Sequence, residues 1–146
     1  EVRRVGFEAA ETIIAMGQRM RAESVIDFPE IDVEAARELM ELVGPSYFVA
    51  LAERDGRPVG FITAQIGRYL FSPEIYVTHE IFYVVPEARG GRTASLLVRA
   101  MEDWAVSMGV TKTFIAVHTG LKQEVTGRFY QKLGYRFMGG NYVKDF

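Results

Sequence analysis

The apolar residues of this chain recur with two periods, one typical of helices and one typical of strands. The most regular stretch begins at Ala94, where apolar residues return every three or four positions, as on one face of an amphipathic helix. The residues of this face are Ala94, Leu97, Val98, Met101, Ala105 and Met108. Gly109 follows at the position where glycine commonly ends a helix. The pattern predicts a helix over residues 94–108 with one buried face.

Three other stretches, residues 9–21, 33–43 and 124–133, have the same helical period. Asp32 precedes the second stretch at the capping position, and Gly134 follows the third as a stop. The residues that we expect to face inward are Ile13, Ile14, Gly17 and Met20 in the first, Ala36, Leu39, Met40 and Val43 in the second, and Val125, Phe129 and Leu133 in the third.

Strand-like runs, rich in β-branched and aromatic residues, occupy most of the remaining chain. They are residues 47–53, 58–67, 74–85, 112–118 and 135–146, with residues 2–5 as a short edge strand or an irregular N-terminus. Asp55-Gly56 between the first two runs is a strong hairpin signal. Gly139-Gly140 interrupts the last run, which is either one bulged strand or a hairpin. The order of elements predicts a single α/β domain over 1–146, a mixed sheet with helices on both faces.

Composition narrows the function classes. The chain has 146 residues, 49% of them hydrophobic and 25% charged, which is ordinary for a soluble domain, and its formal net charge is −2. We expect no nucleic-acid partner, because such a surface needs a basic balance. With no cysteine and two histidines, we expect neither a disulfide nor a metal site. The absence of a long apolar run or signal-peptide pattern predicts no membrane association and a cytoplasmic protein. The chain begins with Glu1 rather than Met, which suggests either that the numbering begins inside a longer sequence or that a few residues are absent.

The segment before the long helix carries the clearest chemical signal. Pro86 stops an apolar strand, and Gly90 and Gly91 then form a turn that leads into the helix. Such a turn lets an anion approach the backbone, and the first N–H groups of the helix point toward it. Thr93 and Ser95 add hydroxyl donors. The alternative is an ordinary strand-to-helix connection that carries two glycines.

Two parts of this segment, Val84-Val85-Pro86 and Arg89 to Ala94, resemble the central motif of the GNAT superfamily of N-acetyltransferases. The resemblance implies a GNAT-like fold: a mixed, mostly antiparallel sheet with a V-shaped cleft between strands 4 and 5. It also implies that the turn holds the pyrophosphate of acetyl-CoA and that N–H groups near Val84 and Val85 polarise the thioester carbonyl. The residues expected to bind this cosubstrate are Val84, Val85, Arg89, Gly90, Gly91, Arg92, Thr93, Ala94 and Ser95. Arg92 replaces a family glycine; it keeps the backbone N–H, while its side chain either crowds the phosphate or binds it.

A second segment, Phe129 to Tyr135, resembles the Phe-Tyr-x-Lys-x-Gly-Phe motif of the same superfamily. The resemblance implies that Tyr130 is the general acid that protonates the leaving thiolate, a role that a phenol in a site shielded from water can fill. The alternative is that Tyr130 only packs against Phe129. Many members carry an Asn seven residues before the tyrosine, where this chain has Gln123.

The reaction also needs a base, because an ammonium group has no lone pair with which to attack a thioester. Glu80 is the candidate, since several family members hold a catalytic Glu in the fourth strand. Strict alternation puts Glu80 on the face of Phe82 and Val84 and puts His79 on the opposite face. The alternatives are His79, His118 at the end of the fifth strand, and a chain of waters.

The resemblance implies that the acceptor site is built by residues 21–32 and 68–73. The first segment holds Glu23, Asp27, Glu30 and Asp32, which would attract a cationic amine or simply form a solvated loop. The second exposes Tyr69, Leu70 and Phe71, which either cover an apolar part of the acceptor or join two copies in a homodimer.

We expect transfer of an acetyl group to a primary amine of a small molecule or peptide. The alternative is an inactive acyl-CoA-binding or interaction protein of the same fold. An unrelated nucleotide binder would need a P-loop lysine or a dinucleotide glycine pattern, and neither is present.

Overall fold

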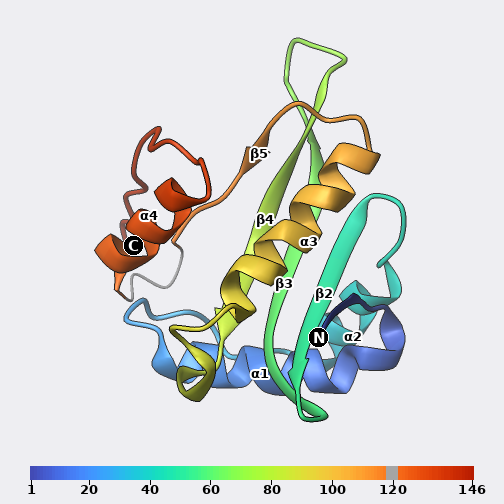
Figure 1. Cartoon of the computed structure of the whole chain (residues 1–146), viewed down its shortest axis with the longest axis vertical. Coiled ribbons are helices and arrows are strands. Elements are labelled where there is room, and N and C mark those ends of the chain that lie inside the picture. The colour runs from blue at the N-terminus through green and yellow to red at the C-terminus, as the bar shows by residue number, and fades with distance from the viewer. Residues whose placement is uncertain (118–121) are drawn as a thin grey trace.

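The computed structural model describes residues 1–117 and 122–146 (Figure 1). The elements in chain order are β1 (Val2–Arg4), η1 (Phe7–Ala9), α1 (Ala10–Glu23), α2 (Val33–Glu41), β2 (Tyr47–Arg54), β3 (Arg57–Arg68), β4 (Ile75–Val84), η2 (Pro86–Ala88), α3 (Thr93–Ser107), β5 (Thr113–Phe114) and α4 (Gln123–Lys132). From β1 to α3, the α-helices and strands match the sequence-based expectation in order and type, with boundaries shifted by a few residues, whereas the short helices η1 and η2 were not predicted.

The five strands form one sheet in the order β1-β2-β3-β4-β5. Neighbouring strands are antiparallel except β4 and β5, which run parallel and pair only at Val77–Thr113 and Thr78–Phe114. Beyond these two pairs β4 continues to Val84, whereas β5 ends at Phe114. The two strands therefore part after a short contact, which confirms the mixed sheet and the divergence predicted between the fourth and fifth strands.

Helices cover both faces of the sheet. Figure 1 shows α3 crossing the face toward the viewer, with α1 and α2 on the other side. The predicted inner face of α3 is confirmed, since Leu97, Val98 and Met101 are fully buried. Farther along α3, Trp104 stacks on Phe48 of β2 with ring centroids 5.1 Å apart. The buried face from Leu97 to Trp104 holds α3 against the sheet and so positions the Gly-rich turn that precedes its N-terminus.

Local signals set the turns that hold these elements. Asp55 and Gly56 both have positive φ, 52° and 73°, as a two-residue hairpin turn between β2 and β3 requires. The carboxylate of Asp32 accepts a hydrogen bond from the Ala35 amide at 3.0 Å, which confirms the predicted cap of α2. Two of the three aromatic and apolar residues expected to be exposed after β3, Leu70 and Phe71, are almost fully exposed. Tyr69 instead packs on Tyr76.

The C-terminal third departs from the prediction. The run at 112–118 narrows to two strand residues, and His118 lies outside the described residues. The predicted strand or hairpin over 135–146 was wrong: these residues form neither helix nor strand. β propensity yields a strand only where a neighbour supplies a ladder, and β5 supplies just two paired residues. Val125 and Leu133, expected to face inward, are 56% and 36% exposed, and Figure 1 shows α4 beside the β5 edge of the sheet rather than across one of its faces.

Within residues 1–117 and 122–146, no helix combines the length and the apolar composition that crossing a membrane requires.

Candidate active site

A cleft of about 770 Å³ opens where β4 and β5 part. One wall is β4 from His79 to Val84, and the opposite wall is the segment after β5 together with α4. The C-terminal end of α1 closes one side, and the turn at the start of α3 closes another. Of the site residues predicted from the sequence, the cleft brings together Glu80, Val84, Arg89, Gly90, Gly91, Ala94 and Tyr130.

A β-bulge in β4 decides which side chains face which side of the cleft. Thr63 of β3 pairs with Ile81, but the next residue, Ala64, pairs with His79, so Glu80 is the extra residue of β4. The Gln65 side chain donates a hydrogen bond to Glu80 Oε1 at 2.7 Å, which places Glu80 on the face covered by α1. Strict alternation predicted that Glu80 would share a face with Phe82, and that prediction was wrong because of the bulge.

His79 lies on the other face of β4, as predicted, and is 3% exposed. Its Nδ1 accepts a hydrogen bond from the Ala116 amide at 3.2 Å. This bond ties the segment after β5 to β4 just below the point where the cleft opens. Because the His79 ring is buried and its Nδ1 is bonded to the Ala116 amide, a structural role suits it better than proton transfer does.

The turn before α3 has the geometry that its glycines allow. Gly90 has φ of +81°, a left-handed conformation that side chains other than glycine adopt at a cost. Gly90, Gly91 and Ala94 line the cleft, so the first turn of α3 presents backbone to it. Arg92 and Thr93 instead line a second hollow of about 420 Å³ on the side of the β2–β3 hairpin.

The remaining predicted cosubstrate residues make contacts within the protein. The Val85 amide donates to the Val59 carbonyl at 3.0 Å and is therefore part of the sheet. Successive amides of a strand point to opposite sides, so that of Val84 faces away from β3, toward the cleft. The Ser95 hydroxyl donates to the Arg92 carbonyl at 2.9 Å, and Thr93 Oγ1 accepts from Arg54 at 3.4 Å.

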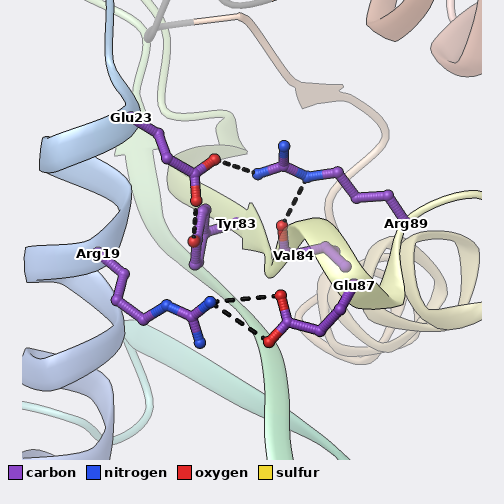
Figure 2. A network of polar contacts seen from close by, with 6 residues as sticks. All are labelled: Arg19, Glu23, Tyr83, Val84, Glu87 and Arg89. Carbon is purple, nitrogen blue, oxygen red and sulfur yellow. Dashed lines mark hydrogen bonds and ion pairs between the residues drawn. The ribbon is translucent and has the colours of Figure 1, made fainter.

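Arg89 is held by a network that crosses from the turn to α1 (Figure 2). Its Nε donates to the Val84 carbonyl at 2.8 Å, and its Nη2 donates to Glu23 Oε2 at 2.6 Å. The other oxygen of Glu23 accepts a hydrogen bond from the Tyr83 hydroxyl at 2.5 Å. Burial, followed by the hydrogen bond and charge of Glu23, raises the pKa of Tyr83 to about 12. Burial alone would raise the pKa of Glu23, but the bonds from Tyr83 and Arg89 outweigh it and lower that pKa.

Tyr130 lies at the inner end of the cleft and is 7% exposed. Its hydroxyl donates to the Ala116 carbonyl at 3.1 Å. Its ring belongs to an aromatic group with Phe82, Phe129 and Tyr135, with centroids 5.7 to 6.4 Å apart. Burial, with a smaller contribution from Tyr135, raises the pKa of Tyr130 above that of a free phenol, so the hydroxyl keeps its proton at neutral pH.

Sequence reasoning missed two residues beside the site. Glu23 was noted only as one of several acidic residues in the connector, and Arg54, which precedes the Asp55-Gly56 hairpin signal, was given no role. Both reach the turn from elements far away in the sequence. Arg54 could have been found from the predicted order of strands. If β3 pairs with β4, the β2–β3 hairpin lies at the end of β4 that leads into the turn, as it does in the structure. In the part of the chain that the structure describes, no group of three or more His, Asp or Glu side chains is arranged to hold a metal ion.

The fold is shared with solved acetyltransferases. An aminoglycoside acetyltransferase, meta-AAC0020, from an uncultured soil metagenomic sample superposes with a TM-score of 0.81 at 14% identity, over 100% of this chain and 95% of that chain. AAC(6')-Iy in complex with a CoA-containing bisubstrate analogue superposes with a TM-score of 0.80 at 18% identity, over 99% and 96%. The ribosomal-protein-alanine N-acetyltransferase from Brucella melitensis biovar Abortus 2308 gives 0.76 at 16% identity, over 100% and 99%.

No curated protein matches the sequence. The model of the Acetyltransferase (GNAT) family, however, matches residues 13–135, which include both motifs and every element from α1 to α4 except the first residues of α1. The sheet order, the parting of β4 and β5 and the helices on both faces agree with this match. The chain therefore belongs to the acetyltransferase (GNAT) family.

Proposed function

We propose that this protein transfers the acetyl group of acetyl-CoA directly to a primary amine of a small molecule or peptide. The observation that carries the proposal is the cleft between β4 and α4, because Tyr130, the Val84 backbone and the Gly-rich turn line the same cavity. The types of residue that line the cleft match the anionic and the uncharged parts of acetyl-CoA. A turn with positive φ at Gly90 presents backbone to an anion, and apolar side chains such as Phe82 and Phe129 suit the uncharged arm.

In this proposal the pyrophosphate lies at the turn from Arg89 to Ala94, held chiefly by backbone N–H groups. The Val84 amide faces the cleft and polarises the thioester carbonyl. The Val85 amide is excluded from this role because it bonds to Val59 within the sheet. Arg92 and Arg54, which line the second hollow, supply positive charge at the outer edge of the turn, and Thr93 lies beside Arg54 there.

The chemical step forms one bond and breaks one. The amine nitrogen attacks the carbonyl carbon, so that a C–N bond forms and the C–S bond breaks, and the sulfur leaves as a thiolate that takes a proton. Tyr130 is the proposed donor of that proton, because its phenol is protonated at neutral pH and lines the cleft. Glu80 is the proposed base that removes a proton from the amine. It lines the cleft from the face of α1, whereas Tyr130 approaches from α4.

The acceptor is proposed to enter from the side of α1. Met20, Glu23, Ser24 and Phe28 line the cleft there, and they belong to the end of α1 and the following connector. The proteins of similar fold are named as acetyltransferases of aminoglycosides and of ribosomal-protein alanine. They support an amine as the acceptor group, and their names include both a small-molecule class and a ribosomal protein.

The test is incubation of the purified protein with acetyl-CoA and a panel of amines, followed by detection of released CoA with a thiol reagent. The chain contains no cysteine, so the protein contributes no thiol background. Mass spectrometry of the amine then identifies the acetylated product. Amine-dependent release that is lost in Tyr130→Phe supports the proposal. Tight binding of acetyl-CoA with no turnover across the panel would favour the alternative, an acyl-CoA-binding protein without transferase activity.

A further inference from the structure

The side chain of Arg89 is turned away from the turn in which it lies. Its Nε donates to the Val84 carbonyl at 2.8 Å, its Nη2 donates to Glu23 at 2.6 Å, and its guanidinium carbon lies 5.7 Å from the centroid of the Tyr83 ring (Figure 2). These three contacts direct the guanidinium toward β4 and α1. The Arg89 guanidinium therefore links the turn to β4 and α1, and it does not point toward the turn as a phosphate ligand would.

Glu23 is the centre of this link. One carboxylate oxygen accepts from Arg89 and the other accepts from Tyr83, so both oxygens are used. The side chains of Arg89 and Glu23 are 32% and 26% exposed, which makes the pair less screened than an ion pair in open solvent. Charge-assisted hydrogen bonds of this length are about twice as strong as neutral ones.

The two ends of the link belong to different sides of the cleft. Arg89 begins the turn whose next two residues, Gly90 and Gly91, line the cosubstrate side. Glu23 is the last residue of α1, and Ser24 after it begins the connector on the acceptor side. A rigid bond between Arg89 and Glu23 therefore joins the position of the turn to the position of the acceptor wall.

We propose that Glu23 is a positioning residue that braces the Gly-rich turn through the guanidinium of Arg89, and so couples the acceptor side of the cleft to acetyl-CoA binding. This inference rests on the proposed function, because the turn must bind CoA for its bracing to be measurable. Glu23 lines the cleft at the end of α1, whereas Gly90 and Gly91 line it at the turn, so in this proposal Glu23 acts on the turn through Arg89. Its effect on CoA affinity arises because a turn held in its binding geometry loses less conformational freedom when the ligand binds.

The rival role for Arg89 is direct phosphate binding, and the two roles predict opposite effects of removing Glu23. If Arg89 is a phosphate ligand, Glu23→Gln removes a competing carboxylate and leaves CoA affinity unchanged or improved. If Arg89 is a brace, Glu23→Gln weakens CoA binding about as much as Arg89→Gln does. The double variant then loses no more than either single variant, since both break the same contact.

The experiment is a double-mutant cycle of CoA affinity, measured by isothermal titration on wild type, Glu23→Gln, Arg89→Gln and the double variant. We expect each of the three variants to bind CoA about fivefold more weakly than wild type. In the transferase assay at a saturating amine concentration, Glu23→Gln should raise the KM for acetyl-CoA by a similar factor.

The chain offers a matched control between α1 and the residues just before the turn. Arg19 of α1 and Glu87 of η2 form an ion pair at 3.3 Å, and their side chains are 51% and 65% exposed (Figure 2). Exposed pairs contribute little, so Glu87→Gln should leave CoA affinity unchanged. Tyr83→Phe is the second probe, since it removes one bond to Glu23 and keeps the ring beside Arg89; it should give a smaller loss than Glu23→Gln. Thermal unfolding of each variant verifies that it is folded at the titration temperature.

Unchanged or tighter CoA binding in Glu23→Gln overturns the inference, as do additive losses in the double variant. An equal loss in Glu87→Gln also overturns it, because the effect would then come from any change between α1 and η2. If wild type itself binds no CoA, the proposed function fails and the inference fails with it. A wild type that binds CoA, with Glu23→Gln as tight, overturns the inference alone.

Discussion

The phenol of Tyr130 donates a hydrogen bond to the carbonyl oxygen of Ala116 at 3.1 Å, and this bond joins α4 to the segment that follows β5. The same Ala116 donates its amide to His79 of β4. One residue thus fixes both walls at the inner end of the cleft. Tyr130 is held there with its proton in place, because burial raises its pKa.

Replacing Tyr130 by Phe should lower kcat by about 10²-fold and leave the KM for acetyl-CoA nearly unchanged, because the ring stays and only the proton donor is lost. Steady-state kinetics over a range of acetyl-CoA concentrations measures both constants. The matched control is Tyr135→Phe, a neighbouring phenol that bonds to Thr113 and does not line the cleft. Equal losses of kcat in the two variants would contradict the role of Tyr130.

Replacing Glu80 by Gln should lower kcat/KM by about 10²-fold at neutral pH, with a smaller loss at alkaline pH, where more of the amine is already neutral. A pH series of initial rates with one amine tests this difference. His79→Asn should instead lower the melting temperature and leave the pH profile of the rate in place, because His79 is buried and bonded to Ala116. A pH profile that is altered by His79→Asn and not by Glu80→Gln would mean that His79 is the base and that Glu80 is not.

The stabilising effect of Glu23 should depend on pH in a defined direction. Its pKa in the folded protein lies below the ordinary value of 4.5, since the bonds from Tyr83 and Arg89 outweigh burial. A carboxyl with a lowered pKa stabilises the fold above its unfolded pKa and loses that effect as pH falls through the folded pKa. The difference in unfolding free energy between wild type and Glu23→Gln should be constant above about pH 5 and shrink below pH 4.5. Denaturant titrations at several pH values measure it, and a difference that grows on acidification would contradict the sign.

Two glycines should respond to alanine in opposite directions. A Cβ at Gly60 would lie 2.9 Å from the Tyr83 carbonyl oxygen and 3.1 Å from Leu97, so Gly60→Ala should destabilise the fold by about 1–3 kcal/mol. A Cβ at Gly127, inside α4, would meet nothing within 4 Å. Gly127→Ala should therefore stabilise by about 0.5–1 kcal/mol through helix propensity. Chemical denaturation distinguishes the two, and a stable Gly60→Ala variant would mean that α3 packs less closely on β3 than the structure indicates.

Much of the fold and part of the site follow from the sequence, for reasons that are local. The helical period of its apolar residues predicted α3, and the two glycines before it predicted the turn. Each of these signals lies within a short stretch of sequence, so it can be read without knowing the tertiary structure. Glu80 was predicted as a site residue, but the face of β4 on which it lies was predicted wrongly, since a bulge is a property of two paired strands and leaves no clear mark on the sequence of one of them. The link from Glu23 to Arg89 spans 66 residues and depends on how α1 lies across the sheet. The missing C-terminal strand reflects a lack of pairing at β5, which β propensity alone does not reveal.

Isothermal titration of the purified protein with acetyl-CoA, with CoA and ATP as comparisons, shows whether the cleft binds the cosubstrate. We predict micromolar binding of acetyl-CoA and CoA and much weaker binding of ATP, because the turn at Gly90 and Gly91 and the apolar walls of the cleft act together on one ligand. Absence of binding at millimolar acetyl-CoA, or binding of ATP as tight as that of CoA, would contradict it.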